Sequence, residues 1–103
     1  MSRKITGPVT SVTTTFDDPV SGSMQVGNTG TPLSSASVSI FGVAVQNDHD
    51  SSVAIYVGGP FRQDWRLDPG ESVSLGAGNL SRVLVRTDGG FATVRFIYFL
   101  ADS

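Results

Sequence analysis

The chain of 103 residues contains no cysteine, and it has one histidine, one lysine and one glutamate. Without cysteine, the fold uses neither a disulfide nor a zinc–thiolate site. Lysine and glutamate usually cover the surfaces of long helices, so their scarcity favours strands. Any histidine-based catalytic centre depends on His49 alone. We therefore expect an all-β protein that is not an enzyme.

Long apolar runs are also missing. No stretch approaches the roughly 20 apolar residues of a membrane helix. The N-terminal Met-Ser-Arg-Lys is followed by threonine, glycine and proline. Because a secretory signal continues with an apolar core, we expect no such signal, synthesis in the cytoplasm and no membrane partner.

Charge is low and unevenly distributed. The net charge of −2 gives no electrostatic reason to expect a nucleic-acid partner. Residues 5–61 contain four aspartates and no lysine or arginine, whereas residues 62–95 contain five arginines. The simplest interpretation is a solvated surface. The alternative is two complementary faces used in self-association or docking.

Residues 1–35 differ in composition from the rest. Thirteen of the 33 residues from Ile5 to Ser37 are serine or threonine, with few apolar anchors among them. Such a segment buries little by itself. It forms either two short strands, at about 8–15 and 23–27, or an extended arm that orders against a neighbouring subunit. We expect one structural domain, with a β-sandwich core at 36–103.

From Ala36 onward, apolar residues alternate with polar ones, and turns recur roughly every 8 to 15 residues, as in a sandwich or barrel. The alternation changes parity at Phe41-Gly42, which predicts a β-bulge. We predict an antiparallel β-sandwich of jelly-roll type. Its expected strands and turns are a strand through 38–45, a polar turn at 47–51, a strand at 53–57, a strand or ordered loop at 61–67, a type II turn at 68–71, strands at 72–75 and 80–86, a hairpin turn at 87–90, and a long strand at 91–100.

The last predicted strand is apolar on both faces. One face carries Val94, Phe96, Tyr98 and Leu100, and the other carries Phe91, Ile97 and Phe99 with Arg95. Burial of both faces is expected. The second face can be covered by another sheet, by the N-terminal arm or by another subunit. We take Phe91, Ile97 and Phe99, together with Arg3 and Lys4, as a candidate subunit or partner interface.

A second candidate surface combines aromatic and basic residues. Tyr56, Arg62 and Trp65, with Phe61 and Arg66 nearby, are typical of a stacking platform for sugars or single-stranded nucleic acid. The structural alternative is a tryptophan that covers one end of the barrel, with an arginine stacked over it.

His49 lies between Asp48 and Asp50 in a predicted turn. Such a triplet is usually a solvated loop, and an oxygen-ligand metal site is the alternative. The EF-hand spacing fails, because Val53 and Gly59 stand where glycine and glutamate are required. We predict no catalytic, cofactor-binding or metal-binding residue.

Residues 45–98 resemble a recurring type of small virion protein of tailed bacteriophages. The resemblance rests on Val45-Gln46-Asn47, on Ile55-Tyr56-Val57-Gly58-Gly59, on Leu67-Asp68-Pro69-Gly70-Glu71-Ser72-Val73-Ser74-Leu75, on Leu80-Ser81-Arg82-Val83-Leu84-Val85, and on Val94-Arg95-Phe96-Ile97-Tyr98.

The resemblance implies a β-sandwich that serves as a head decoration (cement) protein, a head-fibre base or a tail accessory protein. It implies location in the virion, contacts with major capsid or tail proteins and self-association, for which we expect a homotrimer. The alternative is a receptor- or glycan-binding module on a tail or head fibre.

Overall fold

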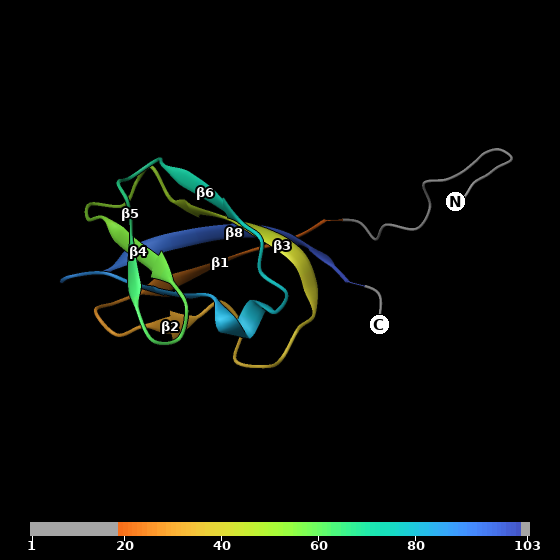
Figure 1. The fold of residues 1–103 in the computed structure, drawn as a ribbon. Coiled ribbons are helices and arrows are strands. Elements are labelled where there is room, and N and C mark those ends of the chain that lie inside the picture. The colour runs from red at the N-terminus through yellow and green to blue at the C-terminus, as the bar shows by residue number, and fades with distance from the viewer. Residues whose placement is uncertain (1–18, 102–103) are drawn as a thin grey trace, which may run out of the picture.

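The computed structural model describes residues 19–101, which form two antiparallel sheets of four strands each (Figure 1). The first sheet has the order β1-β8-β3-β6, with strands Val20–Val26, Ala92–Leu100, Ile40–Asn47 and Ser72–Leu75. The second has the order β2-β7-β4-β5, with strands Thr31–Pro32, Leu84–Arg86, Ile55–Gly58 and Gln63–Leu67. The described part of the chain contains no helix long and apolar enough to span a membrane.

The strand order is that of an eight-stranded jelly roll. The chain passes from one sheet to the other at every connection except the one between β4 and β5, which are adjacent in the same sheet. Apart from β4 and β5, strands that are neighbours in a sheet are not consecutive in sequence, as in two interlocked Greek keys. The predicted all-β, jelly-roll sandwich is confirmed.

The core lies between the sheets and is built by alternation along each strand. Val45 and Val94 of the first sheet and Ile55 and Val85 of the second are fully buried. Because successive side chains of a strand point to opposite faces, the residues between them point outward. Each of these buried side chains stabilises the fold by roughly 1.5–3 kcal/mol.

Both β1 and β2 lie in the segment predicted as an arm. Strand β1 pairs with β8 along its whole length, from Val20 opposite Tyr98 to Val26 opposite Ala92. Val26 and Leu33 belong to the buried core. Residues 20–33 are therefore part of the sandwich. The strand expected at about 23–27 overlaps β1, whereas the one expected at 8–15 lies outside the described residues.

Two local predictions are confirmed by backbone geometry. The register between β3 and β8 shifts between Ile40 and Gly42, so the bulge is at Phe41 as expected. In the turn after β5, Gly70 has a φ of +91°, and the amide of Glu71 donates to the carbonyl of Asp68 at 2.9 Å. A positive φ at this position is what a type II turn requires of glycine.

The predicted strand at 80–86 is wrong in its first half, which is a short 3₁₀ helix, Leu80–Arg82, followed by β7. The cause is Asn79. Its Oδ1 accepts from the amide and hydroxyl of Ser81 and from the amide of Val38, and its Nδ2 donates to Ser37. These bonds hold residues 79–82 in a capped helical turn, so the extended strand begins only at Leu84.

The predicted hairpin at 87–90 is a turn, but it does not join paired strands. Strand β7 belongs to the second sheet and β8 to the first, so the turn carries the chain across the sandwich. Thr87 is fully buried and its hydroxyl donates to the carbonyl of Gly90 at 2.9 Å. Gly90 has a φ of +77°, which permits this tight reversal.

A buried asparagine ties the two sheets together. Asn47, at the end of β3, is fully buried, and its Nδ2 donates to the carbonyls of Val53 at 2.9 Å and of Leu67 at 3.1 Å. Its backbone bonds to the turn after β5, donating to Glu71 and accepting from Gly70. One residue of the first sheet thus fixes the start of β4, the end of β5 and the turn that leads to β6.

We predict that Asn47→Ala lowers the free energy of unfolding by about 1–3 kcal/mol, because the buried carbonyl of Leu67 and the partly buried carbonyl of Val53 lose their partner. Chemical denaturation measures this change. The control is Gln46→Ala, whose exposed side chain should change stability by no more than about 0.5 kcal/mol. Equal stability of the two variants would contradict the importance of the Asn47 link.

Candidate functional site

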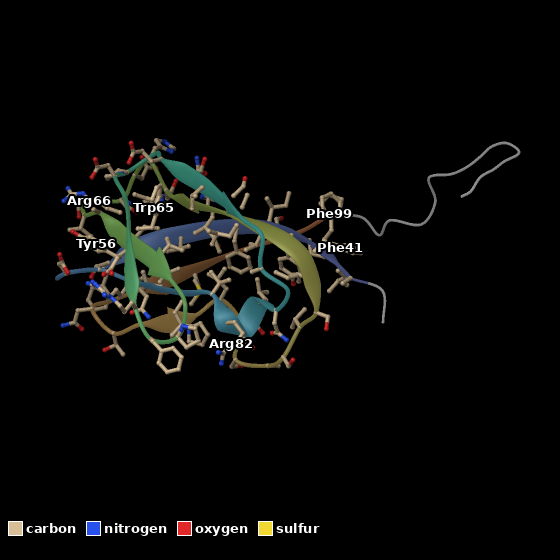
Figure 2. All side chains as sticks on the ribbon, in the orientation of Figure 1. Phe41, Tyr56, Trp65, Arg66, Arg82 and Phe99 are labelled. Atoms are coloured by element: carbon tan, nitrogen blue, oxygen red, sulfur yellow. The ribbon has the colours of Figure 1, made fainter. Side chains whose placement is uncertain are left out.

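The outer face of the first sheet carries an exposed apolar surface. Ile97 and Phe99 point outward from β8 and are 44% and 43% exposed, and Phe41 at the bulge of β3 is 61% exposed. Figure 2 shows Phe41 and Phe99 close together at one end of the sandwich. We call Phe41, Ile97 and Phe99 the apolar patch.

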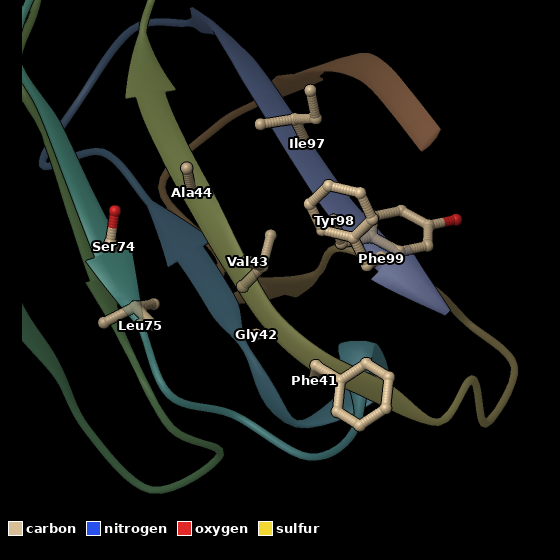
Figure 3. A pocket seen from close by; sticks show the side chains of 9 residues that line it. All are labelled: Phe41, Gly42, Val43, Ala44, Ser74, Leu75, Ile97, Tyr98 and Phe99. Atoms are coloured by element: carbon tan, nitrogen blue, oxygen red, sulfur yellow. The ribbon is translucent and has the colours of Figure 1, made fainter. Parts of the chain in front are cut away.

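Small residues on the neighbouring strands make the apolar patch uneven. Gly42 of β3 lies opposite Phe99, and Ala44 lies opposite Ile97. On β6, Ser74 lies opposite Ala44. The result is a shallow groove of about 350 Å³ beside the large side chains (Figure 3). A protruding side chain of a partner can enter such a groove and pack against the aromatic rings beside it.

The outer face changes from apolar to polar along the strands. The cross-strand row next to that of Ile97 contains Ser23, Arg95, Gln46 and Ser72. A second hollow of about 250 Å³ joins the two rows and is lined in part by Ala44, Arg95 and Ile97. Polar side chains thus border the apolar patch on this side, as the polar rim of a protein–protein contact surface does.

The predicted interface residues do not form a single cluster. Phe91 is 67% exposed, but it precedes β8 at the opposite end from Phe99. Ile97 lies six positions further along the extended chain, about 20 Å away at the usual rise of a strand. Phe91 lies instead over Gly27, where an added Cβ would be 3.2 Å from its ring. Arg3 and Lys4 lie outside the described residues. Phe41 was not among the predicted interface residues, but it belongs to the apolar patch. In the sequence, only the predicted bulge at Phe41-Gly42 indicated that this side chain could leave the regular strand alternation.

The strand register separates the residues of the predicted stacking platform. Tyr56 lies opposite Arg66, whereas Trp65 lies opposite Val57, so the two aromatic side chains belong to opposite faces of the second sheet. Trp65 is 62% exposed on the edge strand β5. Arg62 lies before this strand and forms an ion pair with Asp64 at 2.8 Å.

Tyr56 belongs to a different cluster, on the outer face of the second sheet. The Arg86 guanidinium lies over its ring, 4.7 Å from the centroid, and also binds Asp88 at 2.6 Å. The hydrogen bond that Arg86 donates, and to a smaller extent the one from Tyr56, hold the pKa of Asp88 below its ordinary value. Arg66 binds Asp68 at 3.0 Å. These contacts occupy the arginines with neighbours in the same chain.

The predicted polar turn is present, and its three titratable side chains converge. His49 is 79% exposed, and its two ring nitrogens lie 3.3 Å from Asp48 and from Asp50. Arg95 reaches Asp48 from β8 at 3.4 Å. The candidate ligand atoms of the triplet all lie within 4.8 Å of one another. Since Asp48 is held by an arginine and its neighbours are exposed, the geometry is that of a surface ion-pair cluster.

Two opposing effects set the pKa of Asp48. Partial burial raises this pKa. The hydrogen bond and the charge of Arg95, with a smaller effect of His49, lower it. Together the lowering effects outweigh burial, so the pKa of Asp48 is below its ordinary value of 3.8. A carboxylate with a lowered folded-state pKa stabilises the fold above its unfolded pKa. This contribution is lost as the pH falls through the folded-state pKa.

We predict that Arg95→Gln raises the pKa of Asp48, because it removes the principal group that stabilises the carboxylate. A titration of the side-chain carboxyl carbons by NMR measures the shift. Arg62→Gln, which removes an exposed arginine paired with Asp64, is the control and should leave the pKa of Asp48 unchanged. An unchanged pKa in Arg95→Gln would show that Arg95 is not what stabilises the charged form.

We also predict that the fluorescence of Trp65, the one tryptophan of the chain, has the red-shifted maximum of a solvated indole and is quenched efficiently by acrylamide. Phe61→Trp in a Trp65→Phe background gives a reference for an exposed site, since Phe61 is 92% exposed. A blue-shifted, unquenched Trp65 would mean that this ring is covered in solution.

Comparisons with known proteins do not add a family. No protein-family model matches the chain, and no curated protein matches it.

Proposed function

We propose that the protein is a non-enzymatic structural component of a tailed-phage virion. It acts as a capsid decoration (cement) protein, or as a head or tail accessory protein, that stabilises the particle through protein–protein contacts. It assembles with itself and with other virion proteins, such as the major capsid or tail proteins. The observation that carries this proposal is the exposed apolar patch on the outer face of the first sheet.

The fold supports the proposal without deciding it. Eight-stranded jelly rolls recur in viral capsid proteins and in lectins. Because one fold serves many functions, the topology alone selects neither. The resemblance of residues 45–98 to small phage virion proteins favours the first of the two.

The apolar patch provides the energy for attachment. Burial of Phe41, Ile97 and Phe99 against another protein would contribute roughly 1.5–3 kcal/mol for each side chain, reduced by the part already buried in the free chain. The patch lies on β3 and β8, the two central strands of the first sheet. Central strands are held on both sides, so a load on the patch is transmitted to the whole sheet.

A role without catalysis is supported by where the titratable groups lie. His49 is on an exposed turn between two carboxylates, one of which is held by Arg95. General acid–base catalysis needs such a group beside a site that can hold a substrate. The groove beside the apolar patch is lined instead by apolar side chains, small residues, the hydroxyl of Ser74 and Tyr98.

A second candidate function is glycan binding, and the exposure of Trp65 favours it. Sugars stack on exposed aromatic rings, and lectins use jelly rolls. Since Tyr56 lies on the other face of the sheet, Trp65 and the preceding loop with Arg62 would have to form such a site without it. A glycan array in which the wild type and Trp65→Ala give the same signal would eliminate this function.

We predict that Phe99→Asp weakens binding to phage particles that lack the protein by at least tenfold. The loss of apolar burial and the burial of an unpaired charge together cost more than about 1.4 kcal/mol of binding free energy, which corresponds to a factor of ten in affinity. Co-sedimentation with the particles measures the affinity. Phe91→Asp is the matched control, because it replaces an exposed phenylalanine that lies just before the far end of β8. Undiminished binding of Phe99→Asp would exclude the apolar patch as the attachment surface.

A further inference from the structure

The two sheets have four edge strands, and three of them are protected against pairing with another chain. Strand β2 has two residues, one of them Pro32. Strand β5 carries Asp64 and Arg66 and has a register shift against β4. Strand β6 is only four residues long. Proline, charge, bulges and short length are the devices by which natural proteins block edge-to-edge pairing.

Strand β1 has none of these devices. It runs for seven residues, Val-Ser-Gly-Ser-Met-Gln-Val, without a charge or proline. Its pairing with β8 is continuous, without a register shift. Among the described residues, no strand pairs with its other side. Its outward backbone groups therefore offer a regular, uncharged template for a further strand.

The sequence of β1 is compatible with its own copy in antiparallel orientation. With a two-fold axis at Ser23, Val20 of one copy lies opposite Val26 of the other, Ser21 opposite Gln25, and Gly22 opposite Met24. Val20, Gly22, Met24 and Val26 share the core side, and Ser21, Ser23 and Gln25 share the outer side, because their β8 partners do. Apolar residues thus meet apolar residues, and no like charges face each other.

We propose that two copies of the protein pair through β1 in antiparallel orientation, which joins the two β1-β8-β3-β6 sheets into one eight-stranded sheet across a two-fold axis. This interface deepens the proposed self-association and predicts a dimer in place of the trimer expected from the resemblance. Continuity of the sheet places two apolar patches on one surface, so a dimer offers two attachment points to a symmetric shell.

The first experiment is the mass of the full chain by light scattering over a range of concentrations. We expect twice the chain mass of 10.8 kDa for the wild type, and the monomer mass for Ser23→Glu. A glutamate at this position faces its own copy across the axis, but lies beside Arg95 within the chain, so the fold is retained. Ser72→Glu is the matched control, since Ser72 is in the same cross-strand row at the opposite edge, and it should stay dimeric.

The second experiment identifies the occupant of the edge. Because the chain has no cysteine, Ser23→Cys introduces a single thiol, and oxidation should link two copies covalently. Ser72→Cys should remain unlinked. A wild-type monomer or trimer, a dimeric Ser23→Glu, or a Ser23→Cys that does not cross-link would each overturn the inference. Particle binding by a monomeric wild type would overturn it while leaving the proposed function intact.

Discussion

The hydrogen bonds of Asn47 hold the arrangement on which the rest of the molecule depends. A sandwich of short strands has few contacts that fix one sheet relative to the other, because apolar packing is not directional. Asn47 supplies direction, since its amide reaches Val53 and Leu67 and its backbone holds the turn at Gly70 and Glu71. With β3 fixed in this way, its outward residues and those of β8 keep one register, and the apolar patch keeps one shape.

The apolar patch and the β1 edge are two surfaces of the same sheet with different physical characters. The patch presents side chains, so it recognises the shape and apolar character of a partner. The edge presents backbone hydrogen-bonding groups, so it recognises a strand of matching length. A protein that bridges a shell needs both kinds of contact, one to attach to the surface and one to link copies to each other. Because both surfaces lie on one hydrogen-bonded sheet, a mechanical force applied at one contact is transmitted through the sheet to the other.

The sequence was sufficient for the features that local chemistry determines. The alternation of apolar and polar residues predicted the all-β class, and its change of parity at Phe41 predicted the bulge. Pro69-Gly70 predicted the type II turn. It was insufficient where contacts are distant in the chain. The 3₁₀ helix at Leu80–Arg82 depends on bonds from Asn79 to Ser37 and Val38. The separation of Tyr56 from Trp65 depends on strand register, and that of Phe91 from Phe99 on position along β8. Asn47 looked like the first residue of a polar turn, because nothing local indicates that its amide is buried.

The central claim is that the apolar patch is the surface buried on the particle. Hydroxyl-radical footprinting of the protein, free and bound to particles, measures the solvent accessibility of each aromatic side chain. The account predicts that binding strongly reduces the labelling of Phe41 and Phe99, while Phe91, at the other end of β8, is labelled as in the free protein. Undiminished labelling of Phe41 and Phe99 on the particle would contradict the account.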